Sequence, residues 1–346
     1  MLAPKLSTRT VACLAILTSM LALAGVAYAD SHDEELASMR YVPPISQPFL
    51  NEPPQNTTEL RPIYIYNKQP KSFYRSGHTN IVSLQLRYAI TERLGLIITK
   101  NGWADFNTSS RSQLDQDEGW LNLAFGLKWA WLNNVADNSF FSLGLRYEAP
   151  SGDLNSGGLA RSLLPQVDDG MGGLMPDPTV DADERVKLSM QGNGDGFINV
   201  FATGHWLYRD KIGIQTIFGL NQAIDTTNNS SFVHWSLHGD YEIFRNAFLV
   251  METNMIASAD EGSRTVARRN DADATPIKLS EIKTSEGNDL VNLGSDDPGT
   301  VITYAAGARY RFSDHFLLGF GYEVPLLQGR KDMLDYRFMF DAVLRL

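Results

Sequence analysis

The C-terminal residues of this chain alternate between apolar and polar side chains. Counting back from the terminus, every second residue is apolar: Leu346, Leu344, Ala342, Phe340, Phe338 and Tyr336. The intervening positions include Arg345, Asp341 and Arg337. Successive side chains of a β-strand point to opposite faces, so this period of two predicts a strand with one apolar face and one polar face.

The same alternation recurs along most of the sequence. In residues 119–131, for example, Phe125 and Leu127 alternate with Gly126 and Lys128. Twelve strand candidates follow this rule, at about residues 60–68, 80–91, 94–105, 119–131, 140–149, 197–208, 211–223, 231–243, 247–257, 300–312, 316–324 and 335–346. Alternation spread over many short segments is the sequence signature of a transmembrane β-barrel.

The lengths of the connections alternate too. Short turns follow the even-numbered strands, at residues 92–93, 133–139, 209–210, 244–246 and 313–315. Longer links follow the odd-numbered strands, and the two longest are 150–196 and 258–299. Outer-membrane barrels have an even strand number, short periplasmic turns and longer outer loops. The sequence therefore predicts an all-β fold, a transmembrane antiparallel β-barrel of about 12 strands spanning residues 59–346, with both termini in the periplasm.

A soluble β-sandwich or lipocalin-like barrel would show the same alternation, with its apolar face turned inward. Two patterns favour the membrane barrel. Small residues such as Gly126 and Gly144 gather on the polar face, and large aromatic residues such as Trp131 and Tyr147 lie near strand ends. The aromatic positions resemble the two girdles at the membrane interfaces.

The first 58 residues precede the predicted barrel. Residues 1–29 have the features of a secretory signal peptide: Lys5 and Arg9, then an apolar stretch, then a small-x-small site at residues 27–29. The alternative is an N-terminal membrane anchor. The single cysteine, Cys13, lies inside this segment, so no disulfide framework is expected afterwards. Residues 30–58 are acidic and then rich in proline, and we expect a periplasmic segment outside the sheet.

Three segments carry a resemblance to a known family. Residues 307–312 read GARYRF, residues 322–326 read YEVPL, and the alternating terminal strand follows. They resemble the outer-membrane β-barrel family named for the MetA pathway of phenol degradation. The resemblance implies an outer-membrane channel of a Gram-negative-type bacterium, with aromatic or otherwise apolar compounds as candidate solutes. One departure is Leu346, where outer-membrane barrels usually end in an aromatic residue.

The polar face of the predicted strands supplies candidate lumen residues. They are Arg87, Lys128, Arg146, Glu148, His234, His238, Asp240, Glu242, Arg309, Arg311, Glu323, Arg337, Asp341 and Arg345. Lumen side chains tune the selectivity of barrel channels. They can equally form a structural network of salt bridges that fills the interior. A twelve-strand barrel lies between filled eight-strand barrels and wide sixteen-strand porins, so we expect a narrow or partly plugged lumen.

The long loops offer a second candidate for the constriction. Loop 150–196 carries apolar residues, namely Leu163, Leu164, Met171, Leu174 and Met175. It either folds into the mouth of the barrel or lies on the surface, and the sequence leaves both alternatives open. The sequence assigns no role to loop 258–299.

Other chemistries have weaker support. Along a strand, His234 and His238 are about 13 Å apart and cannot share one metal ion without a third element. No G-x-S-x-G motif is present. We therefore expect no metal, cofactor or enzyme activity. Nucleic acid is excluded as a partner because the formal net charge is −10. The expected partners are outer-membrane lipids, the barrel-assembly machinery and a small solute. The rival functions are a closed structural or surface-binding barrel and, less favoured, a lipid-modifying enzyme.

Overall fold

The computed structural model describes ten segments of the chain: residues 39–69, 77–107, 116–157, 166–168, 174–176, 187–263, 265–266, 277–278, 299–327 and 334–346. The predicted signal peptide and residues 30–38 lie outside these segments, as do Leu163, Leu164 and Met171 of loop 150–196. The two alternatives for this loop, in the mouth of the barrel or on the surface, therefore both stay open.

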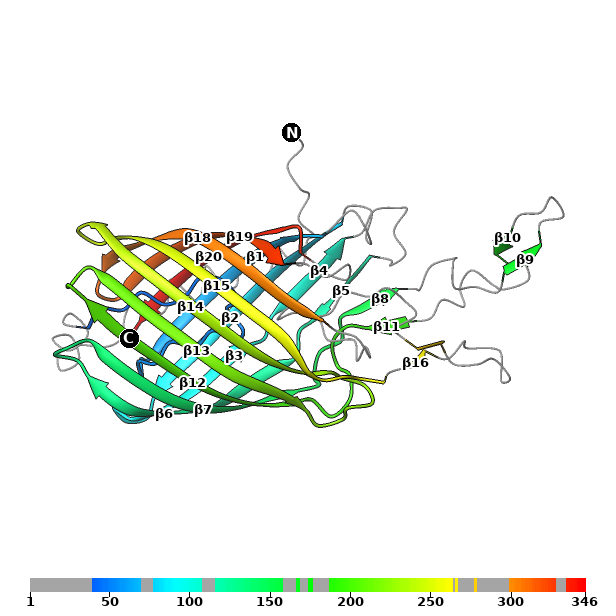
Figure 1. The fold of residues 1–346 in the computed structure, drawn as a ribbon, viewed down its shortest axis with the longest axis horizontal. Helices are drawn as coiled ribbons and strands as arrows, with labels where there is room; N and C mark the ends of the chain where they lie inside the picture. Colours follow the sequence, from blue (N-terminus) through cyan, green and yellow to red (C-terminus); the bar gives the residue numbers. More distant parts are fainter. Residues whose placement is uncertain are drawn as a thin grey trace, which may run out of the picture.

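One antiparallel sheet forms the body of the molecule (Figure 1). Its strands are β1 (Glu59–Lys68), β2 (His78–Ala89), β3 (Leu94–Lys100), β4 (Trp103–Asn107), β5 (Asp117–Trp120), β6 (Leu123–Asn134), β7 (Ser139–Ala149), β12 (Phe197–Tyr208), β13 (Ile212–Ala223), β14 (Ser231–Phe244), β15 (Ala247–Asp260), β18 (Thr300–Ser313), β19 (Phe316–Leu327) and β20 (Tyr336–Arg345). Because β1 pairs with both β2 and β20, the sheet closes on itself.

The closed sheet has twelve barrel strands. β3 and β4 follow one another along β2 and count as one barrel strand, and β5 and β6 likewise follow one another. The predicted fold class, a twelve-strand antiparallel barrel, is confirmed. Three short pairs lie outside the barrel sheet: β8 (Asn155–Gly157) with β11 (Lys187–Ser189), β9 (Gln166–Asp168) with β10 (Leu174–Pro176), and β16 (Thr265–Val266) with β17 (Ile277–Lys278).

The break between β3 and β4 has a local cause. Gly102 has a φ of 119°, which an L side chain rarely adopts. The side-chain amide of Asn101 fills the gap in the ladder by accepting from the Leu84 N–H at 3.0 Å and donating to the Leu84 carbonyl at 2.5 Å. The predicted strand 94–105 is therefore one barrel strand with a kink.

The two faces of the barrel differ as the alternation predicts. On β6, Leu127 and Trp131 are 48% and 70% exposed on the outer face, whereas Lys128 on the inner face is 1% exposed. The inner face also buries Arg61, Arg309 and Arg337. Apolar side chains outside and charged side chains inside are the reverse of a soluble barrel, and they fit a barrel surrounded by lipid.

The N-terminal segment corrects one prediction. Residues 39–57, hereafter the plug, lie inside the barrel instead of beyond it (blue in Figure 1). Arg40, for example, is 8% exposed and bonds to Asp240 on the lumen face. The plug is correctly predicted to lie outside the sheet, because its five prolines remove backbone donors. Its carbonyl groups bond instead to lumen side chains, which the prediction of a periplasmic segment did not anticipate.

No helix in the described segments is long and apolar enough to cross a membrane.

Candidate functional site in the barrel lumen

The plug enters the barrel at the end with the short turns, reverses direction, and returns to that end. Met39 packs against Phe140 and Val135 near the turn between β6 and β7. The reversal lies at Gln47, whose carbonyl accepts from the N–H groups of Leu50 and Asn51 at 3.0 and 2.9 Å. The plug therefore has a rising arm, residues 39–46, and a returning arm, residues 48–57.

Acidic side chains of β14 and β15 hold the rising arm. The Arg40 guanidinium lies 2.5 Å from Asp240 and 3.3 Å from Glu242. Farther along the arm, the Ile45 and Ser46 N–H groups donate to the Glu252 carboxylate at 2.7 and 2.6 Å. The rising arm thus presents donors to a wall of carboxylates.

The His238 ring lies between two of these carboxylates. Its Nδ1 atom is 2.8 Å from Glu252, and its Nε2 atom is 3.5 Å from Asp240. The ring is buried, as is that of His234 on the same strand face. His238 therefore links the carboxylate that holds Arg40 to the one that holds residues 45 and 46.

Basic and polar side chains on the other side hold the returning arm through its carbonyl groups. Arg146 donates to the Phe49 and Leu50 carbonyls at 2.8 and 3.2 Å. Lys128 donates to the Pro53 and Gln55 carbonyls at 2.7 and 2.8 Å. Two neutral donors add to the row, since Gln85 bonds to the Pro48 carbonyl and Ser142 to the Pro54 carbonyl.

One carboxylate of the returning arm forms buried ion pairs. Glu52 lies 2.7 Å from Arg87 and 2.8 Å from Lys128. Burial alone would raise the pKa of the Glu52 carboxyl, but the two cations outweigh burial and lower this pKa to about 2. Glu52 is therefore ionised at neutral pH, and its charge holds the returning arm against β2 and β6.

A third set of contacts holds the rising arm at its prolines. Arg309 donates to the Pro43 carbonyl at 2.6 Å and to the Pro44 carbonyl at 3.1 Å. Arg61 also donates to the Pro44 carbonyl. Asp341 pairs with both guanidinium groups, at 2.7 Å from each. These cations bond to an acceptor-rich peptide segment that has few donors of its own.

The structure places all the predicted lumen residues on the inner face of the barrel. Those that contact the plug are Arg87, Lys128, Arg146, Asp240, Glu242, Arg309, Glu323 and, through its ring contact with Tyr41, Arg345. The others contact neighbouring wall residues: Glu148 pairs with Lys100, Arg337 with Glu323, Asp341 with Arg309, His238 with Glu252, Arg311 lies over the Phe248 ring, and His234 lies beside Phe232. Their role in selectivity stays a prediction.

Sequence reasoning missed several residues that hold the plug. Arg61 lies on β1, where Ile63 and Ile65 share its inner face, so the alternation there is weak. Arg40 and Glu52 lie in the plug itself. A signal was nevertheless present, because large apolar residues stand among the prolines. Tyr41 and Phe49 are both buried in the structure, and such residues are unusual in a solvated segment.

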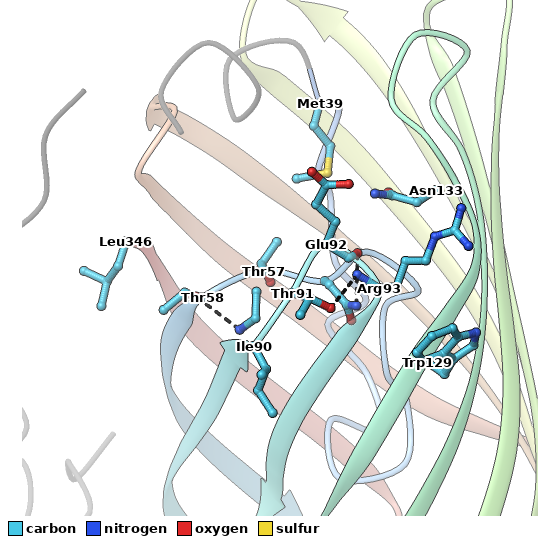
Figure 2. A pocket seen from close by; sticks show the side chains of 12 residues that line it. Met39, Thr57, Thr58, Ile90, Thr91, Glu92, Arg93, Trp129, Asn133 and Leu346 are labelled. Atoms are coloured by element: carbon cyan, nitrogen blue, oxygen red, sulfur yellow. Dashed lines mark hydrogen bonds between the residues drawn. The ribbon is translucent and has the colours of Figure 1, made fainter. Parts of the chain in front are cut away.

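Hollows border the described part of the barrel at its rim and on its outer face. A cavity of about 640 Å³ lies at the short-turn rim, and Figure 2 shows Met39 and Thr57 from the two ends of the plug on its wall, together with Arg93 and Leu346. There the Asn56 amide donates to the Glu92 carbonyl at 3.3 Å. A second hollow of about 670 Å³ has Tyr64, Phe320 and Phe340 of the outer face among its lining residues. The rim cavity leaves free space beside both ends of the plug.

Comparison with known proteins supports the fold. No family model matches the chain, and no curated protein matches it. Among solved structures, the COG4313 outer membrane channel from Pseudomonas putida F1 aligns with a TM-score of 0.55 at 12% identity, over 88% of this chain and 100% of that one. At this identity the likeness shows the fold alone, which is that of a bacterial outer-membrane barrel.

Two further structures align less well. The translocator domain of the autotransporter NalP from Neisseria meningitidis has a TM-score of 0.45 at 8% identity, over 98% of both chains. The toluene transporter TodX of Pseudomonas putida has a TM-score of 0.42 at 12% identity, over 85% of this chain and 89% of that one.

Proposed function

We propose that this protein is an outer-membrane channel for passive passage of small solutes, closed by its own plug. The observation that carries the proposal is the way in which the plug occupies the lumen. It adds no strand to the sheet, and β1 and β20 close the barrel without it. The barrel is therefore a complete tube whose contents are held by side-chain contacts that water or a solute could replace.

The orientation follows from the connections. Short turns of outer-membrane barrels face the periplasm. The plug begins and ends at the short-turn rim, and the Leu346 N–H donates to the Thr58 carbonyl there. We therefore propose an outer-membrane location with both ends of the described chain on the periplasmic side. Release of the plug would then occur toward the periplasm, beside the rim cavity.

A transport role has two further supports. One is the resemblance to the MetA-pathway family, and the other is the fold shared with the COG4313 protein, which is an outer membrane channel. We propose membership of the MetA-pathway family on the basis of residues 307–312, residues 322–326 and the terminal strand. The resemblance suggests aromatic or apolar solutes. Among the described residues, the inner face carries many charged and amide side chains beside buried apolar ones such as Ile65, Phe201 and Val343, so polar solutes are candidates as well.

One rival function is favoured by a specific observation. The plug is held along its whole length, from Arg40 to Gln55. A plug held in this way suits a closed barrel with a structural or surface-binding role, because such a barrel needs no open path through its lumen. The other rival function, a lipid-modifying enzyme, would require a catalytic histidine on the lipid-facing side. His234 and His238 do not meet this requirement. They are 1% and 2% exposed on the lumen face.

A reversible cross-link separates the channel from the closed barrel. Asn51 of the plug and Asn254 of β15 are joined by a hydrogen bond of 3.0 Å. The single natural cysteine lies in the predicted signal peptide, so Asn51→Cys/Asn254→Cys provides one thiol pair for a short bridging reagent that a reductant cleaves. We expect no single-channel steps in planar bilayers while the bridge is intact, and steps after reduction.

The matched control is Asn51→Ser/Asn254→Ser, which should conduct with and without the reagent and the reductant. A bridged protein that conducts as well as the reduced one would show that the plug does not close the path. Absence of steps in every state, for protein folded as a barrel, would favour the closed structural barrel.

A further inference from the structure

Two walls of the lumen carry charges of opposite sign, whereas the sector between them on β18–β20 and β1 carries both signs, as in the cluster of Arg61, Arg309 and Asp341. The basic wall consists of Arg87 on β2, Lys128 on β6 and Arg146 on β7. The acidic wall consists of Asp240 and Glu242 on β14 and Glu252 on β15. In the closed order of twelve barrel strands, β2 lies six positions from β14, which is the diametrically opposite place, and β6 and β7 lie three to five positions from β14 and β15.

The two walls face each other at the same depth. Asn51 bonds to Asn254, next to Glu252 on the inner face of β15, while the following residue, Glu52, bonds to Arg87 and Lys128. Consecutive Cα atoms are about 3.8 Å apart, so two adjacent residues and their side chains span the lumen at this level.

A second pair of contacts gives the same result. The Ser46 N–H donates to Glu252, and the Phe49 carbonyl, three residues later, accepts from Arg146. Three residues of extended chain reach at most about 11 Å. The Glu252 carboxylate and the Arg146 guanidinium therefore lie on opposite sides of the turn that the plug makes at Gln47.

Neither wall is neutralised by its own neighbours. On the basic side, Glu59 pairs with Arg87 and Glu148 pairs with Lys100, which leaves Lys128 and Arg146 without a carboxylate partner among the described residues of that wall. On the acidic side, the described cation-forming neighbours are His238, between Asp240 and Glu252, and Arg311 of the adjacent β18, which lies over the Phe248 ring. Departure of the plug would therefore expose an excess of cations opposite an excess of carboxylates.

The plug matches this separation. Its rising arm presents a guanidinium and two N–H donors to the acidic wall, and its returning arm presents carbonyl oxygens and one carboxylate to the basic wall. The plug therefore has one side that offers positive groups, which faces the acidic wall, and one side that offers negative groups, which faces the basic wall.

We propose that the open lumen selects small zwitterionic solutes, which carry an ammonium group and a carboxylate. The inference rests on the proposed channel function and specifies its substrate class. Opposed charges across a narrow lumen with low-dielectric walls focus the electric field. A zwitterion gains by orienting in this field, with its carboxylate toward Lys128 and Arg146 and its ammonium toward Asp240 and Glu252. A neutral solute of the same size gains little.

The test uses the full-length protein with the plug weakened by Arg40→Gln/Glu52→Gln, both in the plug, so that the walls stay intact. This released variant is placed in liposomes, and swelling rates are measured with glycine and with glycolamide, its uncharged isomer. We expect glycine to enter at least about three-fold faster. Adding Lys128→Gln/Arg146→Gln, or Asp240→Asn/Glu252→Gln, should bring the ratio to about one.

Arg209→Gln is the matched control, because Arg209 is exposed in the short turn after β12, and it should leave the ratio unchanged. Heat-dependent gel mobility verifies that each variant is folded. Equal rates for the two solutes in the released variant, or a ratio insensitive to both wall variants, would overturn the zwitterion inference and leave the channel intact. Entry of neither solute into liposomes carrying folded released variant would overturn the channel proposal and this inference with it.

Discussion

At the scale of single residues, the lumen depends on small side chains opposite large ones. Gly319 faces the ion pair of Arg309 and Asp341, which holds the plug at Pro43 and Pro44. A Cβ at position 319 would overlap Asp341 Oδ1 and lie 2.7 Å from Arg309 Nη1. Glycine leaves room there for the close approach of two side chains that are paired with each other.

We predict that Gly319→Ala displaces this ion pair and weakens the plug. Overpacking of this kind costs about 1–3 kcal/mol, which denaturant unfolding of liposome-inserted protein would measure, and the open probability in bilayers should rise. The control is Gly239→Ala on β14, where the nearest atom to an added Cβ is the Met251 carbonyl oxygen at 3.9 Å. Equal effects of the two substitutions would contradict the role of Gly319.

At the scale of elements, the plug is a segment without regular structure that is held by its polar groups. Prolines supply carbonyl acceptors without N–H donors, and the lumen supplies Arg61, Arg146 and Arg309 as donors. The few plug donors meet carboxylates of β14 and β15. The plug has the proline-rich composition of a flexible linker. Its many carbonyl acceptors therefore match a lumen that is rich in basic side chains.

The plug also makes the opening of the channel depend on pH. The pKa of Glu52 is about 2 with the plug in place, against an ordinary value of 4.5. Because the folded pKa is depressed, the contribution of Glu52 to holding the plug is fully present above about pH 4.5 and is lost as the pH falls toward 2. We predict that the open probability of the wild-type channel rises as the pH is lowered from about 4.5 to about 2.

Recordings of Glu52→Gln supply the comparison. This variant should open more often than wild type at pH 7, and should lack the component of the pH response that arises between pH 4.5 and 2. Identical pH profiles for the two proteins would show that Glu52 does not control the plug.

At the scale of the whole molecule, the closed sheet reverses the usual distribution of side chains. Trp131 and Leu145 are exposed outside, while Arg61, Arg309 and Arg337 are buried inside. Closure removes both sheet edges, so that every backbone group of the barrel can be paired in a lipid environment. The fold is thus stable where lipid covers the outer face and polar contacts fill the inner one.

We predict that the protein fractionates with the outer membrane and migrates faster on a gel before heating than after it, because a closed barrel resists detergent until heated. The checks are fractionation of cells followed by electrophoresis of boiled and unboiled samples. Recovery of the protein wholly in the soluble periplasm would overturn the membrane assignment.

The sequence alone determined the strands and their faces. The side chains of Phe125 and Leu127 alternate with those of Gly126 and Lys128 because covalent geometry sends neighbours in a strand to opposite sides, and this local rule needs no knowledge of the fold. The alternation of turn lengths likewise agreed with the even strand number. β1 was less clear, since apolar residues occupy both of its faces.

Only the tertiary structure decided what fills the lumen. Arg40 meets Asp240 across 200 residues of sequence, and Pro44 meets Arg309 across 265. The plug has no periodicity to reveal such partners, because its position follows from charges and donors that barrel closure brings to opposite walls. The terminal strand shows the difference. Its alternation predicts the lumen face of Asp341, but the ion pairs of Asp341 with Arg61 and Arg309, which in turn bond to the plug prolines, exist only once the barrel has closed.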